Sequence, residues 1–341
     1  MKAFVRQSQH YRDAAVIDID RPTAGPGEVL VHVSHCGLCG SDIRIHDAVE
    51  PPLDRSWLTR VPVVMGHEYA GEVVEVGDGV DAEWIGAHVA VISIQPCGEC
   101  NECRQGMPNV CGARRSPGVT YDGGLAEFSA LPVTGVFRIP DDIPLELAAL
   151  IEPMSVAIHA AKVSRVFAEP GRATVSGPGP IGIFAGLWLL SQGWDVTVIG
   201  RESDAEKRLP VARRFGMTTR PADEELCPGE EPDFWVEASG APQAMSAAVA
   251  QVRRRGVISA VGIPHGPGSY DLVALARREV TVRGSYAFEL EDYQSSVDLL
   301  RSGRLSDVEG FVDVYPLADT LRAIDDARAG HSMKPMISTR G

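Results

Sequence analysis

The sequence lacks the excess of positive charge on which nucleic-acid binding depends. Its 341 residues include 32 Lys and Arg against 46 Asp and Glu, so the formal net charge is −14. Because an acidic chain repels phosphate backbones, this balance argues against general nucleic-acid binding. It disfavours binding to anionic membrane surfaces for the same reason.

Long hydrophobic runs are also lacking. The longest strongly apolar stretch, residues 181–190, has about half of the ~20 residues that a membrane-spanning helix needs. Residues 1–13 do not contain the apolar run of a secretory signal, so we expect a cytoplasmic protein. The chain is nevertheless 44% hydrophobic and 23% charged, which is typical of a soluble globular protein of one or two domains.

Cysteine is scarce in the last two-thirds of the chain, where Cys227 stands alone and is expected to be incidental. The other six cysteines lie between Cys36 and Cys111. Clustered cysteines in a large chain without a signal peptide more often bind metal than form disulfides. Cys36 lies three residues before Cys39 and imitates a redox pair, but we interpret it as a small side chain at a strand end.

The chain changes its secondary-structure pattern near residue 145. Before that point, short β-branched runs such as residues 28–33, 72–76 and 88–92 alternate with Gly and Pro, which predicts a small barrel or sandwich. After it, strands expected at residues 173–176 and 195–199 are followed by helical stretches at residues 180–192 and 206–215. Alternating strands and helices predict a parallel sheet, so the fold class is α/β.

A glycine-rich loop lies between the first expected strand and helix of this second region. Gly177, Gly179 and Gly182 form G-x-G-x-x-G, with Pro180 and Ile181 between the last two glycines. The glycines allow a tight turn, close approach of a pyrophosphate, and close helix–strand packing. The helix N-terminus then offers N–H groups to the phosphates, so the loop predicts a dinucleotide site.

The end of the second strand indicates which dinucleotide binds. An acidic residue there would bond the ribose 2′-OH of NAD, but the strand ends in Gly200 and Arg201. An arginine suits the 2′-phosphate of NADP, and Lys207 and Arg208 add positive charge. NADP is therefore expected. NAD remains the alternative, because Glu202 follows directly.

Four cysteines form a compact C-x-x-C-x-x-C-x7-C pattern in residues 97–111. Thiolates at Cys97, Cys100, Cys103 and Cys111 suit a closed tetrahedral zinc site with no position open to substrate. A structural zinc is therefore expected. A four-thiolate iron–sulfur cluster is the chief competitor.

Three further short motifs occur in a fixed order with the features above. Cys39 lies in Gly-Leu-Cys-Gly-Ser-Asp, His67 and Glu68 follow a glycine, and Glu152 precedes a proline. Together with the cysteine loop and the glycine loop, this order resembles the zinc-dependent medium-chain dehydrogenases/reductases over nearly the whole chain. The resemblance is closest to the polyol (sorbitol-like) and threonine dehydrogenase branch, which has a Glu-Pro context at the position of Glu152.

The resemblance implies a GroES-like, β-rich catalytic domain and a Rossmann domain with the active site between them. The expected limits are residues 1–150 for the catalytic domain, 151–288 for the Rossmann domain, and 289–341 for a return to the catalytic domain. It also implies a catalytic zinc held by Cys39, His67 and either Glu68 or Glu152. Asp42 would orient His67.

The resemblance implies hydride transfer between a secondary alcohol and the nicotinamide, with two zinc ions per chain. Ser41 is the expected first proton carrier. Some relatives have a relay histidine at the position of Arg44, which cannot release its proton, so His46 is the substitute expected here. Trp57, within residues 47–60, and Tyr121 are candidate liners of the substrate pocket.

Several alternatives remain open at the level of the sequence. The substrate is a polyol, sugar, cyclitol or amino alcohol, and a homodimer or homotetramer is implied. An NAD-dependent polyol or threonine-type dehydrogenase is the nearest alternative. A zinc module for nucleic acid conflicts with the net charge of −14. A non-catalytic dinucleotide-binding protein is the remote alternative, but it would be expected to have a damaged zinc set.

Overall fold

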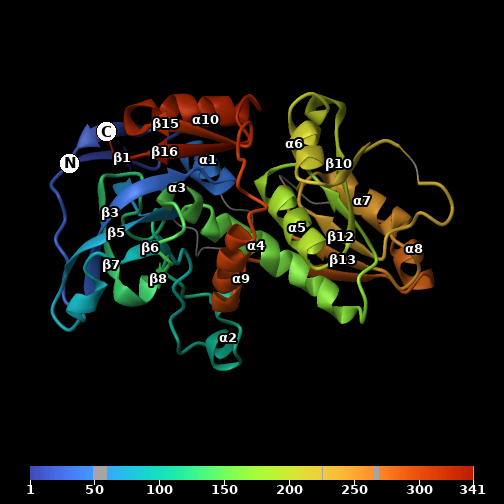
Figure 1. The fold of residues 1–341 in the computed structure, drawn as a ribbon, viewed down its shortest axis with the longest axis horizontal. Helices are drawn as coiled ribbons and strands as arrows, with labels where there is room; N and C mark the ends of the chain where they lie inside the picture. The colour runs from blue at the N-terminus through green and yellow to red at the C-terminus, as the bar shows by residue number, and fades with distance from the viewer. Residues whose placement is uncertain (49–59, 225, 265–268, 341) are drawn as a thin grey trace. The chain divides into compact units, whose positions relative to one another are not determined.

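The computed structural model describes residues 1–48, 60–224, 226–264 and 269–340. These residues form two compact units (Figure 1). The first comprises Met1–Pro153 and Phe311–Gly341, and the second comprises Met154–Gly310. Helix α4 (Ile151–Ala161) begins at the end of the first unit and continues into the second.

The limits of the second unit differ from the expected ones chiefly at helix α9 (Leu290–Arg301). The hydroxyl groups of Ser155 and Ser296 lie 3.1 Å apart, and Nδ1 of His159 lies 2.9 Å from Oδ2 of Asp292. These contacts join α9 to α4. The chain therefore leaves the second unit after α9 rather than before it.

The first unit is built on two sheets. In the smaller one the strand order is β2-β1-β4, and in the larger one it is β15-β16-β3-β5-β6-β8, with β7 also paired to β3. The strands are β1 (Lys2–Arg6), β2 (Ala14–Asp18), β3 (Glu28–Gly37), β4 (Val63–Val64), β5 (Glu68–Val76), β6 (His88–Val91), β7 (Phe128–Pro132), β8 (Val136–Arg138), β15 (Val312–Pro316) and β16 (Lys334–Ser338).

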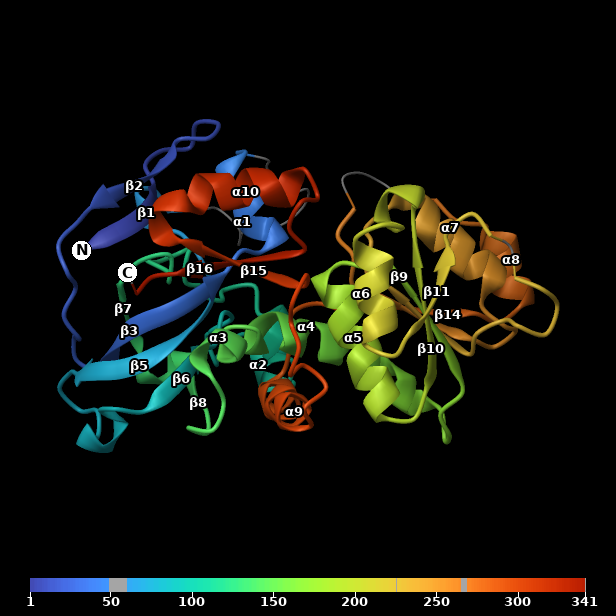
Figure 2. The same ribbon diagram turned by 45° about the horizontal axis from the view of Figure 1, so that its top comes forward.

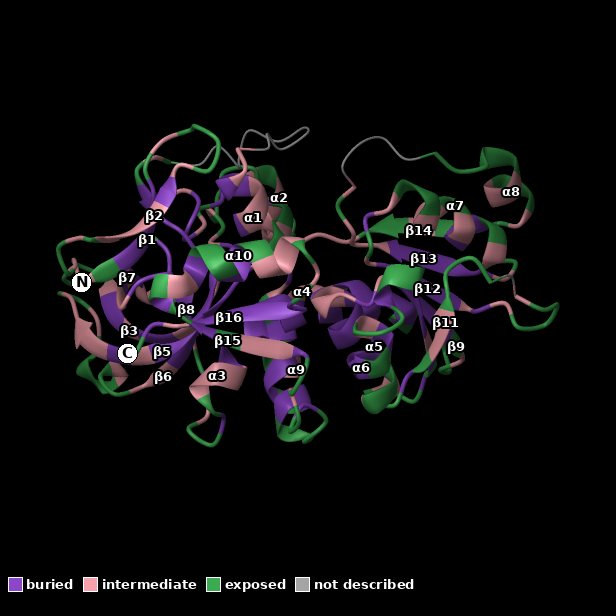
Figure 3. Ribbon diagram, turned by 90° about the horizontal axis from the view of Figure 1, so that it is seen from above, coloured by how far each residue is buried: buried purple, intermediate pink, exposed green. Residues whose placement is uncertain are grey.

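Alternating apolar side chains explain how these strands enclose a core. On β3, Val29, Val31 and Val33 are fully buried, and they pack in one cluster with Val73, Val89 and Leu131 from neighbouring strands. Figure 3 shows the buried residues gathered along β3 and β16. Burial of such a side chain contributes about 1.5–3 kcal/mol to the free energy of unfolding. The strands found here confirm the β-rich prediction for this region.

Short helices connect the strands of the first unit. The last strand, β16, pairs antiparallel with β3, which places the end of the chain beside its first long strand. The helices are α1 (Gly40–His46), α2 (Asn101–Arg104), α3 (Leu145–Ala148) and α10 (Thr320–Arg328).

The second unit contains a parallel sheet in the order β11-β10-β9-β12-β13-β14. Numbered within the unit, this order is 3-2-1-4-5-6, which is the doubly wound Rossmann order. Helices α5 and α6 cover one face and α7 and α8 the other (Figure 2). The elements are β9 (Arg172–Ser176), α5 (Pro180–Ser191), β10 (Asp195–Gly200), α6 (Arg208–Arg214), β11 (Thr218–Pro221), β12 (Phe234–Glu237), α7 (Pro242–Gln251), β13 (Val257–Ala260), α8 (Leu272–Arg277) and β14 (Thr281–Gly284).

The α/β fold class is therefore confirmed, with a β-rich unit and a parallel-sheet unit. The order of strands reverses between β9 and β12, and ligands of open α/β sheets bind at such a switch point, beyond the carboxyl ends of the strands. The glycine loop follows β9 at this edge.

Candidate active site

The glycine loop has the geometry that its sequence predicts. Gly177 has a φ of +97°, and a Cβ at this position would lie 2.8 Å from the backbone of Ser239, which follows β12. A Cβ at Gly182 would lie 2.0 Å from the carbonyl oxygen of Gly177. A Cβ at Gly179 would meet nothing within 4 Å. The loop is thus tightly packed at two glycines and open at the third, which caps the N-terminus of α5.

The turn after β10 contains a buried carboxylate, Asp204, which the sequence did not indicate as a functional residue. Asp204 is buried, and its Oδ2 accepts a hydrogen bond of 2.9 Å from the backbone N–H of Arg201. Its Oδ1 lies 3.7 Å from Nε of Arg208. Asp204 therefore stabilises the turn after β10, and its carboxylate oxygens are engaged by protein groups. Arg201 and Glu202 are exposed, so both predicted ribose-side candidates are open to solvent.

The four cysteines of residues 97–111 converge on one point. The sulfurs of Cys97 and Cys111 are 3.5 Å apart, those of Cys100 and Cys111 are 3.7 Å apart, and those of Cys97 and Cys103 are 4.0 Å apart. All four are free thiols. Backbone N–H groups of Cys97, Cys100 and Cys103 donate to sulfurs of the set at 3.3–3.4 Å.

These distances fit a zinc ion better than a disulfide. Four sulfurs about 2.3 Å from one tetrahedral zinc are about 3.8 Å from one another. A disulfide would need about 2.05 Å between two of them. Donated N–H groups lower the pKa of Cys97 to about 7, whereas burial and the neighbouring thiols raise the pKa of Cys111 and raise that of Cys100 to about 12, because four thiolates repel one another without a cation. The cluster therefore has the spacing and the chemistry of a metal site.

A second group of metal-ligating atoms lies elsewhere in the same unit. The ligating atoms of Cys39, His67 and Glu68 are all within 4.8 Å of one another. Cys39 caps the N-terminus of α1, and its backbone N–H donates to Oδ2 of Asp42 at 2.9 Å. His67 and Glu68 lie at the start of β5. Thiolate, imidazole and carboxylate at this separation are a donor set that zinc accepts.

The imidazole of His67 is contacted at both nitrogens. Oδ1 of Asp42 lies 3.3 Å from Nδ1, and Oγ of Ser41 lies 3.3 Å from Nε2. Burial lowers the pKa of His67, but the charge of Asp42 and the neighbouring Cys39 raise it well above its usual range. A carboxylate beside one ring nitrogen is the partner that commonly orients an imidazole whose other nitrogen binds a metal.

The two candidate glutamates have different partners. Glu68 forms a fully buried ion pair with Lys334 on β16. Glu152 accepts a hydrogen bond of 2.5 Å from Oγ of Ser93, and burial together with the charge of Glu68 raises its pKa to about 7, although His67 opposes the shift. Within the described part of the chain, the group with all its atoms inside 4.8 Å contains Glu68 and not Glu152.

Ser93 and Lys334 were missed by sequence reasoning. Ser93 follows β6 by two residues and Lys334 begins β16, and each meets its glutamate across a long stretch of chain. A lysine is rarely buried unless it is paired, but the burial of Lys334 cannot be read from the sequence.

His46 belongs to a different cluster from Ser41. Its Nδ1 accepts a hydrogen bond of 2.9 Å from Arg328, which also bonds Asp47. Its Nε2 is buried without a hydrogen-bond partner among the residues described. Burial and the charge of Arg328 lower the pKa of His46, so the neutral ring is favoured.

The remaining sequence candidates have simpler settings. Cys36 is fully buried, and burial raises the pKa of its thiol well above the usual range. Tyr121 is buried; its hydroxyl accepts from Gln95, and Arg115 stacks on its ring at 5.0 Å. Trp57 lies outside the described residues.

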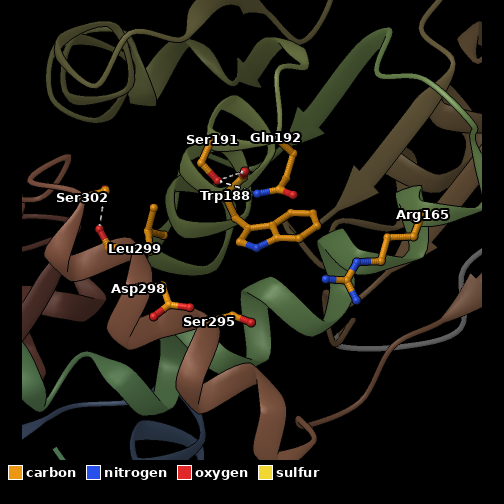
Figure 4. A pocket seen from close by; sticks show the side chains of 8 residues that line it. All are labelled: Arg165, Trp188, Ser191, Gln192, Ser295, Asp298, Leu299 and Ser302. Atoms are coloured by element: carbon orange, nitrogen blue, oxygen red, sulfur yellow. Dashed lines mark hydrogen bonds between the residues drawn. The ribbon is translucent and has the colours of Figure 1, made fainter.

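The second unit has a hollow of about 290 Å³ between α5 and α9 (Figure 4). Its serines Ser191, Ser295 and Ser302 each donate to a carbonyl of their own helix, at 2.6–3.0 Å. Asp298 accepts from Gln294. Because these groups are already bonded locally, we assign the hollow no role in catalysis.

Among the residues that the structure describes, none of the helices is both long enough and apolar enough to cross a membrane.

Comparisons with known proteins agree with this arrangement. Residues 25–141 match the family "Alcohol dehydrogenase GroES-like domain", and residues 145–327 match "Glucose dehydrogenase C-terminus". An L-threonine 3-dehydrogenase from Shewanella frigidimarina is 31% identical over 328 residues, covering 92% of this chain and 91% of the relative. A D-arabitol-phosphate dehydrogenase from Enterococcus avium is 29% identical over 351 residues, covering 99% of this chain and 97% of the relative.

Solved structures show the same fold. The galactitol-1-phosphate dehydrogenase of Escherichia coli superposes with a TM-score of 0.86 at 25% identity, covering 99% of this chain and all of that one (100%). The matched families span both the β-rich unit and the parallel-sheet unit. The chain is therefore an oxidoreductase that belongs to the zinc-type medium-chain dehydrogenase/reductase family of alcohol dehydrogenases.

Proposed function

We propose that this protein transfers a hydride between a secondary alcohol and a nicotinamide cofactor, with NADP preferred. The substrate class is a polyol, sugar, cyclitol or amino alcohol. The observation that carries the proposal is the convergence of Cys39, His67 and Glu68, with Ser41 bonded to His67. The named activities of the relatives, on threonine and on phosphorylated polyols, support a hydroxylated substrate.

Two zinc ions per chain are part of this proposal. Cys97, Cys100, Cys103 and Cys111 would hold a structural ion; Cys39, His67 and Glu68 would hold the catalytic one. When bound, the catalytic zinc would stabilise the negative charge of a substrate alkoxide, and the nicotinamide would accept the hydride.

The chain's own residues orient the reactive groups and move the proton. Asp42 fixes the ring of His67 from the side of Nδ1. Lys334 forms an ion pair with Glu68 and so balances the charge of this carboxylate, whose side chain is only 2% exposed. Ser41 Oγ lies 3.3 Å from Nε2 of His67 and Ser41 is partly exposed, so its hydroxyl would take the substrate proton while its own proton passes to solvent water.

Glu152 has a supporting role in this arrangement. One of its carboxylate oxygens accepts a hydrogen bond from Ser93, and its pKa is raised by burial and by the charge of Glu68. Glu152 is the alternative to Glu68 as the carboxylate ligand. His46, the substitute relay residue expected from the sequence, takes no part in this proton transfer, because its Nδ1 accepts a hydrogen bond from Arg328.

The preference for NADP rests on the electrostatics of residues 200–208. Arg201 is exposed and forms no ion pair among the residues described, whereas Arg208 is engaged by Asp204. A guanidinium that is free to bind favours a phosphate. NAD is the second candidate, because the exposed Glu202 can bond a ribose hydroxyl.

Self-association and location complete the proposal. Strand β14 is the edge of its sheet, and Leu272 and Val273 on the adjacent α8 are 68% and 58% exposed. Such an edge is prone to pair with another chain, which supports a homodimer or homotetramer. Seven free thiols suit the reducing cytoplasm, and the net charge of −14 supports the absence of nucleic-acid and membrane partners.

The test is oxidation of a panel of secondary alcohols with NADP⁺ and with NAD⁺, followed by absorbance of the reduced nicotinamide. Wild type should turn over at least one polyol or amino alcohol. Cys39→Ser and His67→Ala should abolish turnover while they retain coenzyme binding. Cys227→Ser, which changes an exposed cysteine outside both clusters, is the matched control. Near-normal turnover in either ligand variant would refute the mechanism.

A further inference from the structure

Arg44 is placed by helix α1 next to the residues that contact His67. Ser41 and Asp42, in the first turn of α1, lie 3.3 Å from the two nitrogens of that imidazole. Arg44 follows Ser41 by three residues, and residues at this spacing are neighbours on one face of a helix. The buried face of α1 is formed by Asp42, Ile45 and His46, so Arg44 lies at its margin, half-buried.

The charge of Arg44 has no partner in the described part of the chain. Neither a hydrogen bond nor an ion pair joins it to any residue there, although the protein has 46 acidic residues against 32 basic ones. The nearest acid in sequence on its C-terminal side, Asp47, is already bound by Arg12 and Arg328. A guanidinium that no carboxylate among the described residues holds keeps its N–H donors available to an anionic ligand.

We propose that Arg44 binds an anionic group of the substrate, a phosphate or a carboxylate, and so selects anionic alcohols over neutral ones. This inference rests on the proposed function of the Cys39–His67–Glu68 site. A guanidinium presents a rigid fork of donors that matches the oxygens of either anion. Its positive charge persists at every working pH, so selection does not depend on its titration.

Ser41 and Arg44 are close enough along α1 to contact one substrate molecule. Arg44 lies three residues after Ser41, a rise of about 4.5 Å along the helix axis, and its long side chain extends this reach. The favoured substrates are thus polyol phosphates or hydroxy acids.

The first experiment compares matched pairs of substrates on the zinc-loaded enzyme. Each pair is a polyol with and without a terminal phosphate, or with and without a terminal carboxylate. Arg44→Gln should lower kcat/KM for the anionic member by roughly ten- to a hundredfold, mainly through KM, and leave the neutral member unchanged. Arg44→Lys should recover part of the loss. Arg322→Gln, at an exposed position on α10, is the control.

A binding measurement separates failure of this inference from failure of the proposed function. With coenzyme bound, so that the glycine loop is occupied, inorganic phosphate is titrated into wild type and Arg44→Gln by calorimetry. Binding to wild type alone supports the inference even if no alcohol in the panel is oxidised. Equal binding to both proteins, no binding to either, or an equal loss of kcat/KM for neutral and anionic substrates would overturn it. The phosphate and carboxylate pairs distinguish the two anions.

Discussion

Two alanine substitutions in the glycine loop separate its packing role from its binding role. Gly182→Ala adds a methyl group 2.0 Å from the carbonyl oxygen of Gly177 and 3.2 Å from Cγ1 of Val175 on β9. Gly179→Ala adds the same group where nothing lies within 4 Å, at a φ of −81° that alanine adopts without strain. The first methyl meets the protein, and the second meets only space that a bound pyrophosphate would fill.

The magnitudes follow from these distances. Real Cβ atoms do not approach closer than about 3.0 Å, so Gly182→Ala must move the start of α5 from β9 by about 1 Å. Overpacking of this kind costs about 1–3 kcal/mol, and each kcal/mol lowers Tm by roughly 2–4 °C in a domain of 150–250 residues. Gly179→Ala should leave the free energy of unfolding within about 0.5 kcal/mol of wild type. Its affinity for coenzyme should fall at least tenfold, about 1.4 kcal/mol.

The assay combines thermal unfolding of the free protein with a fluorescence titration by reduced coenzyme. Unchanged coenzyme affinity in Gly179→Ala would refute the placement of the pyrophosphate on this loop. Unchanged Tm in Gly182→Ala would refute the packing argument.

Three further predictions concern charge and metal. Arg201→Ala should weaken NADPH binding about tenfold and leave NADH binding unchanged, in a fluorescence titration; an equal effect on both coenzymes would contradict the role given to Arg201. Cys100→Ser should remove one zinc per chain and lower Tm by at least about 5 °C, measured by metal analysis and calorimetry, because a structural metal contributes directly to folding. A variant as stable as wild type with both metals retained would exclude that site. Asp292→Asn should cost about 2 kcal/mol at neutral pH, since burial would raise the pKa of this carboxyl but bonds to His159 and Lys162 hold it below its usual range. Because the pKa of Asp292 is lower in the folded protein than in the unfolded chain, its carboxylate stabilises the fold at a pH above the ordinary aspartate range. The difference in unfolding free energy between the variant and wild type should therefore vanish as the pH falls below the folded pKa of Asp292. Asp298→Asn on the same helix is the control, and a difference that persists in acid would contradict the assignment.

Much of the fold was predictable because its signals are local. The alternation of apolar residues in β3 and the Gly177–Gly182 spacing each depend on neighbours in the chain. The four cysteines lie in one 15-residue loop, so their convergence followed from spacing alone. Resemblance to the family added the grouping of Cys39 and His67 with either Glu68 or Glu152, which local patterns do not show, and the structure brings Glu68 to the first two.

Long-range polar partners were not predictable. Lys334 meets Glu68 across 266 residues, and Arg328 meets His46 across 282. A single charged residue has no periodicity, so nothing in the sequence identifies its partner. These contacts nevertheless affect the site, because Lys334 is the counter-ion of Glu68 and Arg328 holds His46 in a different cluster from Ser41.

The most direct test of the central claim is the zinc content per chain of wild type and Cys39→Ser, with NADPH binding measured on the same samples. We predict two zinc ions in wild type and one in Cys39→Ser, with NADPH bound equally by both. A wild type with fewer than two zinc ions, or a Cys39→Ser variant that keeps both, would contradict the catalytic site proposed for this protein.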